Sequence, residues 1–205
     1  MLPDFTEISS TRTVGDWRAV RPVLKAGADA ATWAEAVNGF YRDRLNSRYL
    51  DPIRAIQAGG GCSGEGFAIV AILCSLIEFL ESCYQGINYV HKKPEPPYQY
   101  NQSGPIFVAF FAAREPFCRR FSVELAQEFY ESVRCGVLHE ARTKKRWRIH
   151  SASGSGLIVD PTNEILYRDD FQDAVIQAID DYSTEVPRNA VLQAAFIRKY
   201  DHLCD

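Results

Sequence analysis

The 205-residue sequence has no pair of cysteines spaced C-x-x-C, although it contains six cysteines. Neighbouring cysteines therefore cannot build a zinc ribbon or a thioredoxin-type redox motif. The chain also lacks an excess of basic residues, because 23 Lys and Arg stand against 26 Asp and Glu. This balance excludes binding of nucleic acid through a strongly positive overall charge, whereas a local basic patch is still allowed.

No apolar run is long enough to span a bilayer, which takes about 20 residues. The most apolar stretch, residues 67–80, contains Glu78, and we expect it to form a buried core helix. The N-terminal residues lack the apolar core of a secretory signal. Several cysteines lie within apolar runs, which is typical of buried thiols in a reducing compartment. We therefore expect a cytoplasmic protein with no disulfide and no membrane contact.

The composition is that of an ordinary globular protein, with 46% apolar and 24% charged residues. Apolar residues recur at helical spacing in most of the chain, and alternation typical of strands is confined to 147–167. We expect a mainly α-helical bundle with a small antiparallel hairpin or meander near the C-terminus, folded as a single domain over 1–205. The expected parts are an irregular arm at 1–27, a helical core at about 28–141, a Pro-rich loop at 91–105, the β element at 147–167 and C-terminal helices at about 169–203.

Within the core, three helices are expected, and each has a local signal at one end. The first starts at Thr32 and is broken by Asp51-Pro52. The second is the apolar helix that follows the glycine cluster AGGGCSGEG at 58–66. The third opens at Glu115-Pro116 and continues to about Ala141, because proline suits the first helical position.

The most informative segment is FYESVRCGVLHEAR, in which Arg134 and His139 are separated by four residues late in the third helix. This Arg-x4-His arrangement on a helix of a compact bundle resembles the HEPN superfamily, which includes many prokaryotic toxins and defence ribonucleases. The family usually has a polar residue directly after the arginine, and Cys135 occupies that position here. The resemblance implies a metal-independent endoribonuclease without a cofactor, acting as a homodimer on RNA, with an antitoxin or defence partner. It also implies products that end in a 2′,3′-cyclic phosphate and a 5′-hydroxyl.

The two residue types suit this chemistry on physical grounds. Histidine titrates nearest neutral pH and can take the 2′-hydroxyl proton, and the planar fork of arginine matches phosphate oxygens. Positions i and i+5 lie about 140° apart on a regular helix, so the side chains of Arg134 and His139 diverge. Convergence requires a bend, for which Gly136 is available, or a second copy of the helix across a dimer. HEPN enzymes use the dimer.

Other residues are expected to support the site. Glu78 or Glu81 would orient Arg134, since a carboxylate in a buried helix needs a partner. The stretch RTKKRWR would hold RNA phosphates through four cations and stack a base on its tryptophan; the cations are Arg142, Lys144, Lys145 and Arg146. Alternatively, this stretch is a charged strand edge that prevents aggregation. Six carboxylates at 169–185 indicate that RNA avoids the C-terminal helices.

Alternatives to the nuclease hypothesis remain open. The chain can be a non-catalytic HEPN-like module that binds a protein or nucleotide, with His139 complementing a helix dipole and Arg134 pairing with Glu131.

The segment Gly60-x-Cys62-x-Gly64 matches a cysteine nucleophile elbow, but such an elbow needs a large parallel sheet. We instead expect a flexible helix entry, with Ser63 as cap and Glu65 in the first turn. Cys135 and His139 share a helix face, as a thiol–imidazole pair would.

Overall fold

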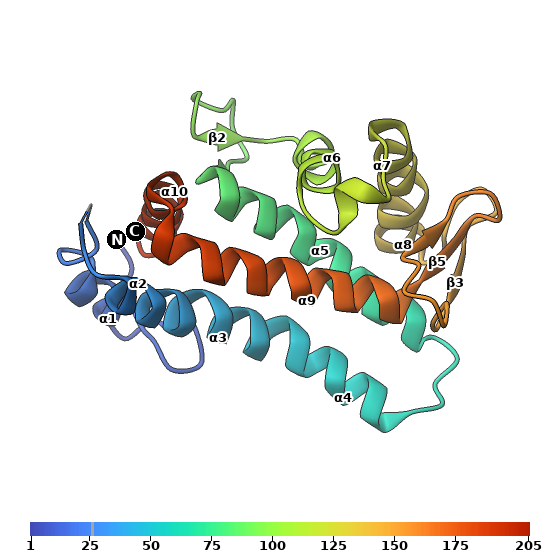
Figure 1. Cartoon of the computed structure of the whole chain (residues 1–205), viewed down its shortest axis with the longest axis horizontal. Helices are drawn as coiled ribbons and strands as arrows, with labels where there is room; N and C mark the ends of the chain where they lie inside the picture. The colour runs from blue at the N-terminus through green and yellow to red at the C-terminus, as the bar shows by residue number, and fades with distance from the viewer. Residues whose placement is uncertain (26) are drawn as a thin grey trace. The chain divides into compact units, whose positions relative to one another are not determined.

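The structure is a computed structural model that describes residues 1–25 and 27–205 (Figure 1). The expected mainly α-helical fold is confirmed, with strands restricted to two small sheets. The chain forms two compact units. Unit 1 contains residues 1–52, 82–101 and 179–205, and unit 2 contains residues 53–81 and 102–178.

Three helices contain the boundaries between the units. They are α4 (Asp51–Gly59), α5 (Glu65–Gln85) and α9 (Arg168–Glu185). Among the described residues, α5 is long and apolar enough by composition to cross a membrane, but more than half of its most apolar window is buried inside the protein. A buried core helix passes the same test, and this is the role that the sequence predicts for this segment.

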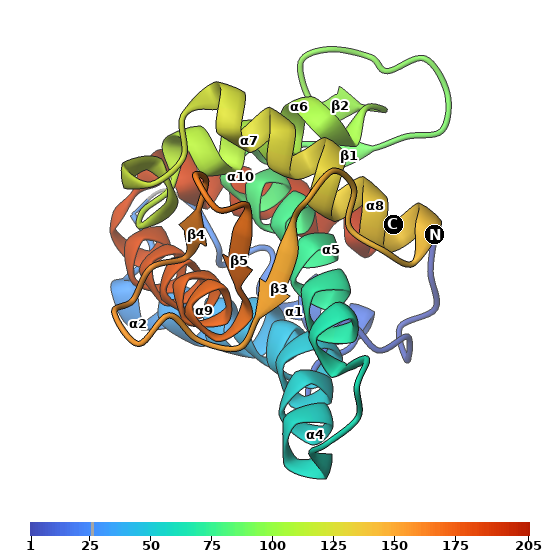
Figure 2. The same ribbon diagram turned by 90° about the vertical axis from the view of Figure 1, so that its right-hand side faces the viewer.

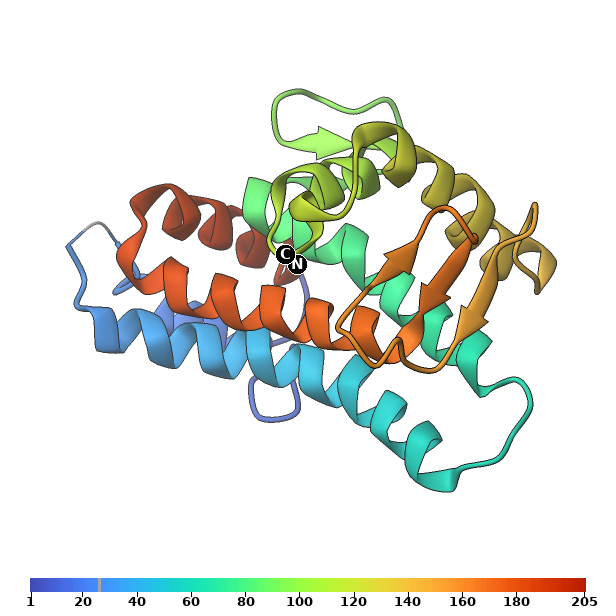
Figure 3. The same cartoon turned by 45° about the vertical axis from the view of Figure 1, so that its right-hand side comes forward.

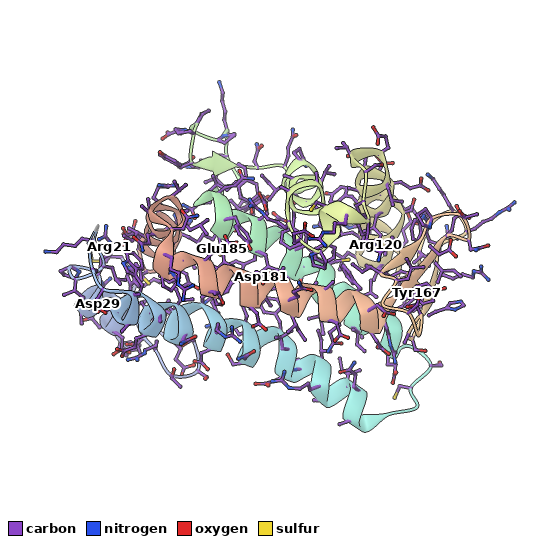
Figure 4. The ribbon with its side chains drawn as sticks, in the orientation of Figure 1. Arg21, Asp29, Arg120, Tyr167, Asp181 and Glu185 are labelled. Atoms are coloured by element: carbon purple, nitrogen blue, oxygen red, sulfur yellow. The ribbon has the colours of Figure 1, made fainter. Side chains whose placement is uncertain are left out.

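Unit 1 begins with a helix that the sequence analysis missed. The expected irregular arm contains α1 (Val14–Val20), which starts at a capping box between Thr13 and Asp16. Its C-terminal end is tied to the last helix, because Arg21, labelled in Figure 4, donates to both carboxylate oxygens of Asp201 at 2.8 and 3.0 Å. The last helix is α10 (Ala190–Leu203), which begins after the Asn189 cap. It follows a short 3₁₀ segment, η5 (Val186–Arg188).

The expected break at Asp51-Pro52 is wrong, since helical residues continue without interruption from 30 to 59. The helix contains a π-helical segment just before the proline, where the Asp51 N–H donates to the Asn46 carbonyl, five residues back. Proline has no backbone N–H to donate to the preceding turn of a helix. In a π turn each N–H donates to the carbonyl five residues back instead of four, and this shift lets the helix continue through Pro52. The run consists of α2 (Ala30–Ala36), η1 (Val37–Arg42), α3 (Asp43–Leu45), η2 (Asn46–Leu50) and α4.

Aromatic rings form much of the core of unit 1. Trp17 of α1 is buried and contacts Phe40 of η1 edge-on, with ring centroids 5.2 Å apart. Phe196 and Tyr200 of α10 complete the cluster, at 5.9 and 5.4 Å from Trp17. These contacts join segments from both ends of the chain, which explains why α10 and α1 belong to one unit.

A parallel strand pair completes unit 1. Strands β1 (Asn88–Tyr89) and β2 (Gln99–Tyr100) pair in parallel, and a wide loop connects them (Figure 2). The expected Pro-rich loop at 91–105 is therefore confirmed for residues 91–98, which lie in the connection between the two strands. Its last residues belong to β2 and to the next helix, α6 (Ser103–Ala113), which the sequence analysis missed.

Unit 2 is built around stacked phenylalanines. Phe111 of α6 contacts Phe121 at 4.4 Å and Phe129 at 5.4 Å, and all three rings are buried. The helix expected to open at Glu115-Pro116 begins later, because Ser122 caps it through the Leu125 N–H. Its parts, after the 3₁₀ segment η3 (Phe117–Arg119), are α7 (Val123–Phe129), the π-helical η4 (Tyr130–Arg134) and α8 (Cys135–Glu140).

The small sheet of unit 2 has the order β3-β5-β4 (Figures 2 and 3). The hairpin of β4 (Val159–Asp160) and β5 (Ile165–Tyr167) is antiparallel, as expected. A fully antiparallel meander is wrong, because β3 (Arg148–His150) pairs with β5 in parallel. After β3 the chain forms β4 at the far edge of the sheet. The tight turn at 161–164 then brings β5 back into the position between β3 and β4. Tyr167, labelled in Figure 4, ends β5 directly before α9.

Candidate functional site

Arg134 is the last residue of the π-helical segment η4, and His139 lies near the end of α8. The Cys135 N–H donates to the Tyr130 carbonyl, five residues back, which is the π-type hydrogen bond. π segments inside α-helices occur often at functional sites. The helix ends at Ala141, which adopts a left-handed conformation with φ of 54°.

The Arg134 side chain is largely buried and has three polar or aromatic neighbours. Its guanidinium lies 3.8 Å from the Glu78 carboxylate of α5, and the two side chains are only 16% and 20% exposed. The guanidinium also lies over the Tyr130 ring at 5.2 Å and approaches the Cys135 sulfur at 4.0 Å. The guanidinium therefore contacts the acid expected to orient it and also an aromatic ring.

Glu81, the other acid proposed for this role, has a different partner. Its carboxylate accepts two hydrogen bonds from Arg114, at 2.8 and 3.0 Å, in a bidentate ion pair. Glu81 is 1% exposed, so this pair supports the packing of α5 within unit 2. The two acids are three positions apart on α5, and each pairs with a different arginine.

His139 is exposed, and no contact joins it to Arg134 among the residues that the structure describes. The five-residue offset on a regular helical segment separates the two side chains around the axis, as the sequence predicts. A single chain therefore does not bring the proposed base and the proposed phosphate ligand to one point. The proposed thiol–imidazole pair is not formed either, since the Cys135 sulfur lies against Arg134.

Gly136 does not bend the helix, contrary to one of the two routes considered for convergence. It is a regular position of α8, and the irregular turn precedes it in η4. Its small size serves a close contact instead, because a Cβ at this position would lie 2.5 Å from the Arg142 carbonyl and 3.1 Å from the Lys144 nitrogen. The Lys144 N–H donates to the Ser132 carbonyl at 2.7 Å and fixes the returning loop on the helix.

Two groups near Arg134, the buried Cys74 and the partly exposed Tyr130, have shifted pKa values. Burial raises the pKa of the Cys74 thiol to about 12, against a smaller opposite effect of Arg134. Burial also raises the pKa of the Tyr130 hydroxyl, and Arg134 again opposes it. Both the thiol and the phenol therefore keep their protons to a higher pH than the free groups do.

The basic stretch at 142–148 is less free to bind phosphates than its sequence suggests. Arg142 and Lys144 pair with Glu140 at 3.4 and 3.1 Å, and Lys145 pairs with Glu128 at 3.2 Å. Arg146 is exposed and has no ion pair within the described residues. These four residues precede β3, so the alternative of a charged strand edge does not describe them.

Trp147 cannot stack a base in this conformation, which corrects the sequence prediction. Its side chain is buried, and its ring contacts Phe129 with centroids 5.8 Å apart. Its indole N–H donates to the Glu128 carboxylate at 3.3 Å. Trp147 therefore anchors the basic stretch to the core of unit 2.

The glycine cluster at 58–66 is not a nucleophile elbow, because the helix α4 ends at Gly59 and the described residues 60–62 form no strand before the thiol. It is the entry to α5, as expected, but Ser63 is not at the cap position, because α5 begins at Glu65 and Gly64 directly precedes it. Backbone bonds close the turn, with the Glu65 N–H donating to the Cys62 carbonyl. The expected favourable position of Glu65 in the first turn is confirmed, and its carboxylate pairs with Arg168 at 2.6 Å.

Tyr130 is the residue of this site that the sequence analysis missed. It lies four residues before Arg134, and i,i+4 spacing on a helix is the signal that predicts such a contact. Among the described residues, no group of three or more His, Cys, Asp or Glu is placed to hold a metal ion. No family model, curated protein or solved structure matches this chain.

Proposed function

We propose that the protein is a metal-independent endoribonuclease of the HEPN type, with Arg134 and His139 as its reactive residues. The observation that carries the proposal is the placement of Arg134 against Glu78, while His139 is exposed on the same helical stretch. An arginine held by an acid is oriented before substrate binds, which lowers the entropic cost of contacting a phosphate. A cytoplasmic toxin or defence role, with an antitoxin or similar partner, fits this activity.

His139 acts as the general base and then as the general acid. It takes the proton of a 2′-hydroxyl, whose oxygen attacks the adjacent phosphorus. The bond from phosphorus to the 5′-oxygen then breaks, and the protonated imidazole returns its proton to that oxygen. Arg134 stabilises the charge on the phosphorane oxygens. The products are a 2′,3′-cyclic phosphate and a 5′-hydroxyl, and no cofactor takes part.

The reaction requires a second copy of the chain, because Arg134 and His139 diverge in one copy. A two-fold axis beside α8 places the same helix of two protomers face to face, and such an interface is self-complementary. Arg134 of one protomer then approaches His139 of its partner. Exposed acids on the same stretch, Glu131 and Glu140, separate the clustered cations.

Arg146 is the first candidate for an additional RNA contact, since it is exposed and has no ion pair within the described residues. Arg142, Lys144 and Lys145 contribute as the RNA phosphates compete with Glu140 and Glu128. Exposed ion pairs are worth only about 0–1 kcal/mol, so this exchange costs little.

A non-catalytic module that binds a protein or a nucleotide is the second candidate. The contacts of Arg134 with Glu78, Tyr130 and Cys135 favour it, because they give the arginine a structural role without any substrate. In such a module, loss of Arg134 lowers stability and no RNA is cleaved.

The test is cleavage of structured and unstructured RNA by purified protein in EDTA. We expect wild-type protein to cleave RNA and His139→Ala to lose the activity with nearly unchanged thermal stability. His150→Ala is the matched control, since His150 is also an exposed histidine of unit 2. Equal activity of the wild type and His139→Ala contradicts the proposal.

The dimer is tested separately by analytical ultracentrifugation across the concentrations used for the assay. We expect a dimer wherever RNA is cleaved. A monomer with full activity contradicts the shared site, even if the His139 result holds.

A further inference from the structure

The loop between β1 and β2 in unit 1 carries exposed aromatic rings next to unpaired lysines. Tyr89 and Tyr98 are 43% and 47% exposed, although tyrosine rings usually gain stability from burial. Lys92 and Lys93 are exposed and have no ion pair in the described part of the chain. We call Tyr89, His91, Lys92, Lys93 and Tyr98 the tyrosine–lysine surface.

The rings of this surface are held in place by neighbours. Tyr89 contacts His91 and Tyr100 edge-on, with centroids 5.1 and 5.7 Å apart. The guanidinium of Arg198 lies over the Tyr98 ring at 4.3 Å and covers one face of it. Arg198 itself donates to the Gln85 and Gly86 carbonyls at the end of α5, so this support is fixed. Ordered rings lose little conformational entropy when a flat ligand stacks on them.

The cations of the surface differ from those at 142–146. At 142–146, three of the four basic side chains are paired with acids. In the segment that carries the tyrosine–lysine surface, residues 88–101, the sequence contains one acid, Glu95. A hollow of about 400 Å³ lies in the loop and is lined by Val90, His91, Lys92, Lys93, Glu95 and Gln99.

We infer that the tyrosine–lysine surface binds single-stranded nucleic acid, with bases stacked on Tyr89 and Tyr98 and phosphates at Lys92 and Lys93. Unpaired cations beside exposed rings are the two components of sequence-independent single-strand binding. Duplexes present no unstacked bases, so they should bind more weakly. The inference does not rest on RNA cleavage, because a strand can bind here whether or not His139 is catalytic.

The experiment measures fluorescence anisotropy of labelled oligonucleotides of about 10 nucleotides, a length within the site sizes of single-strand binders. The probes are 2′-O-methyl RNA and DNA, neither of which has the 2′-hydroxyl needed for cleavage. Comparison of the two probes also separates RNA from DNA as the preferred strand. We expect the double variant Lys92→Glu, Lys93→Glu to bind roughly tenfold or more weakly. The slope of log affinity against log salt concentration should also become less steep by about 1.4, since two phosphate contacts are lost.

The matched charge control is Lys25→Glu with Arg188→Glu, which reverses two other exposed cations of unit 1. The aromatic arm compares Tyr98→Phe, which keeps the ring, with Tyr98→Leu, and uses Phe5→Leu as a control because Phe5 is 81% exposed. We expect Tyr98→Phe to bind as the wild type does and Tyr98→Leu to bind several-fold more weakly. Thermal melting checks that each variant is folded.

Four results overturn the inference. Three are no binding by the wild type, equal loss in the two charge-reversal pairs, and duplex binding as tight as single-strand binding. The fourth is competition by an acidic peptide as strong as that by the oligonucleotide, which identifies a protein-docking surface instead. Each of these results leaves the cleavage assay of the proposed nuclease unaffected, so the two ideas fail separately.

Discussion

The guanidinium of Arg134 lies 3.8 Å from the carboxylate of Glu78, and both side chains are at least four-fifths buried. The distance is that of an ion pair without a short hydrogen bond, which leaves guanidinium N–H groups available to another acceptor. Glu78 therefore lies beside Arg134 without satisfying all of its donors. A phosphate oxygen is an acceptor of the type that such an arginine binds.

Glu78→Gln is expected to lower RNA cleavage about tenfold or more, since a misplaced Arg134 no longer matches the phosphorane. Glutamine has nearly the same size, but it leaves the largely buried Arg134 guanidinium without its ion-pair partner, so the unfolding free energy should also fall by about 3 kcal/mol. The matched control is Glu124→Gln, because Glu124 is an exposed acid in the first turn of α7 and has no part in the proposed site. Cleavage rates and thermal melts measure both effects. Equal rates for the two variants would show that Glu78 does not position Arg134.

Gly136→Ala is expected to destabilise the protein by about 1–3 kcal/mol, because the added Cβ meets the Arg142 carbonyl at 2.5 Å. It should also displace the loop that carries Lys144 and Lys145. Urea unfolding measures the loss. Gly64→Ala is the control, since a Cβ there has no neighbour within 4 Å. A Gly136→Ala variant as stable as Gly64→Ala would contradict the close contact.

Trp147→Ala is expected to cost about 3–5 kcal/mol of stability, because the ring is buried against Phe129. Trp147→Phe keeps an aromatic ring and should lose less. RNA affinity of the folded Trp147→Phe variant should equal that of the wild type. A selective loss of RNA affinity with unchanged stability would indicate that Trp147 stacks a base after all.

Cys74 is expected to resist alkylation in the native protein at pH 8, whereas the exposed Cys62 reacts. Burial raises the pKa of Cys74 to about 12, so its reactive thiolate is scarce. Because the folded protein binds this proton more tightly than the unfolded chain does, the free energy of unfolding is unaffected by Cys74 below about pH 9. It should fall as the pH rises from about 9 toward 12. Mass spectrometry after iodoacetamide treatment measures the first effect. Rapid labelling of Cys74 in folded protein is the contrary result.

Several features of the fold were accessible from sequence because local signals determine them. The apolar helix after the glycine cluster, the acidic start of that helix and the hairpin around 160–165 follow from hydrophobic pattern and turn residues. The helix α6 was missed because its sequence, SGPIFVAFFAA, is apolar on every side and shows no helical period. The parallel pairing of β3 with β5 was missed because strand patterns do not specify which strands become neighbours.

At the candidate site too, local spacing could be interpreted from the sequence, whereas tertiary packing could not. Spacing predicts the divergence of Arg134 and His139. The i,i+4 spacing of Tyr130 and Arg134 is a usable signal too, but the sequence analysis missed it. The choice of Glu78 over Glu81 depends on the packing of α5 in unit 2, and the sequence left both open. The burial of Trp147 was not predicted because five basic neighbours in RTKKRWR indicate exposure, while tertiary contacts with Phe129 decide the outcome.

The most direct test of the central claim is the chemistry of the RNA ends, measured by mass spectrometry after cleavage in EDTA. Attack by the 2′-hydroxyl, with His139 as base, predicts a 2′,3′-cyclic phosphate on one fragment and a 5′-hydroxyl on the other. The same substrate with 2′-deoxy substitution at the cleaved position should stay intact, and so should RNA incubated with His139→Ala. Fragments ending in a 3′-hydroxyl and a 5′-phosphate, or cleavage of the deoxy-substituted strand, would contradict the account.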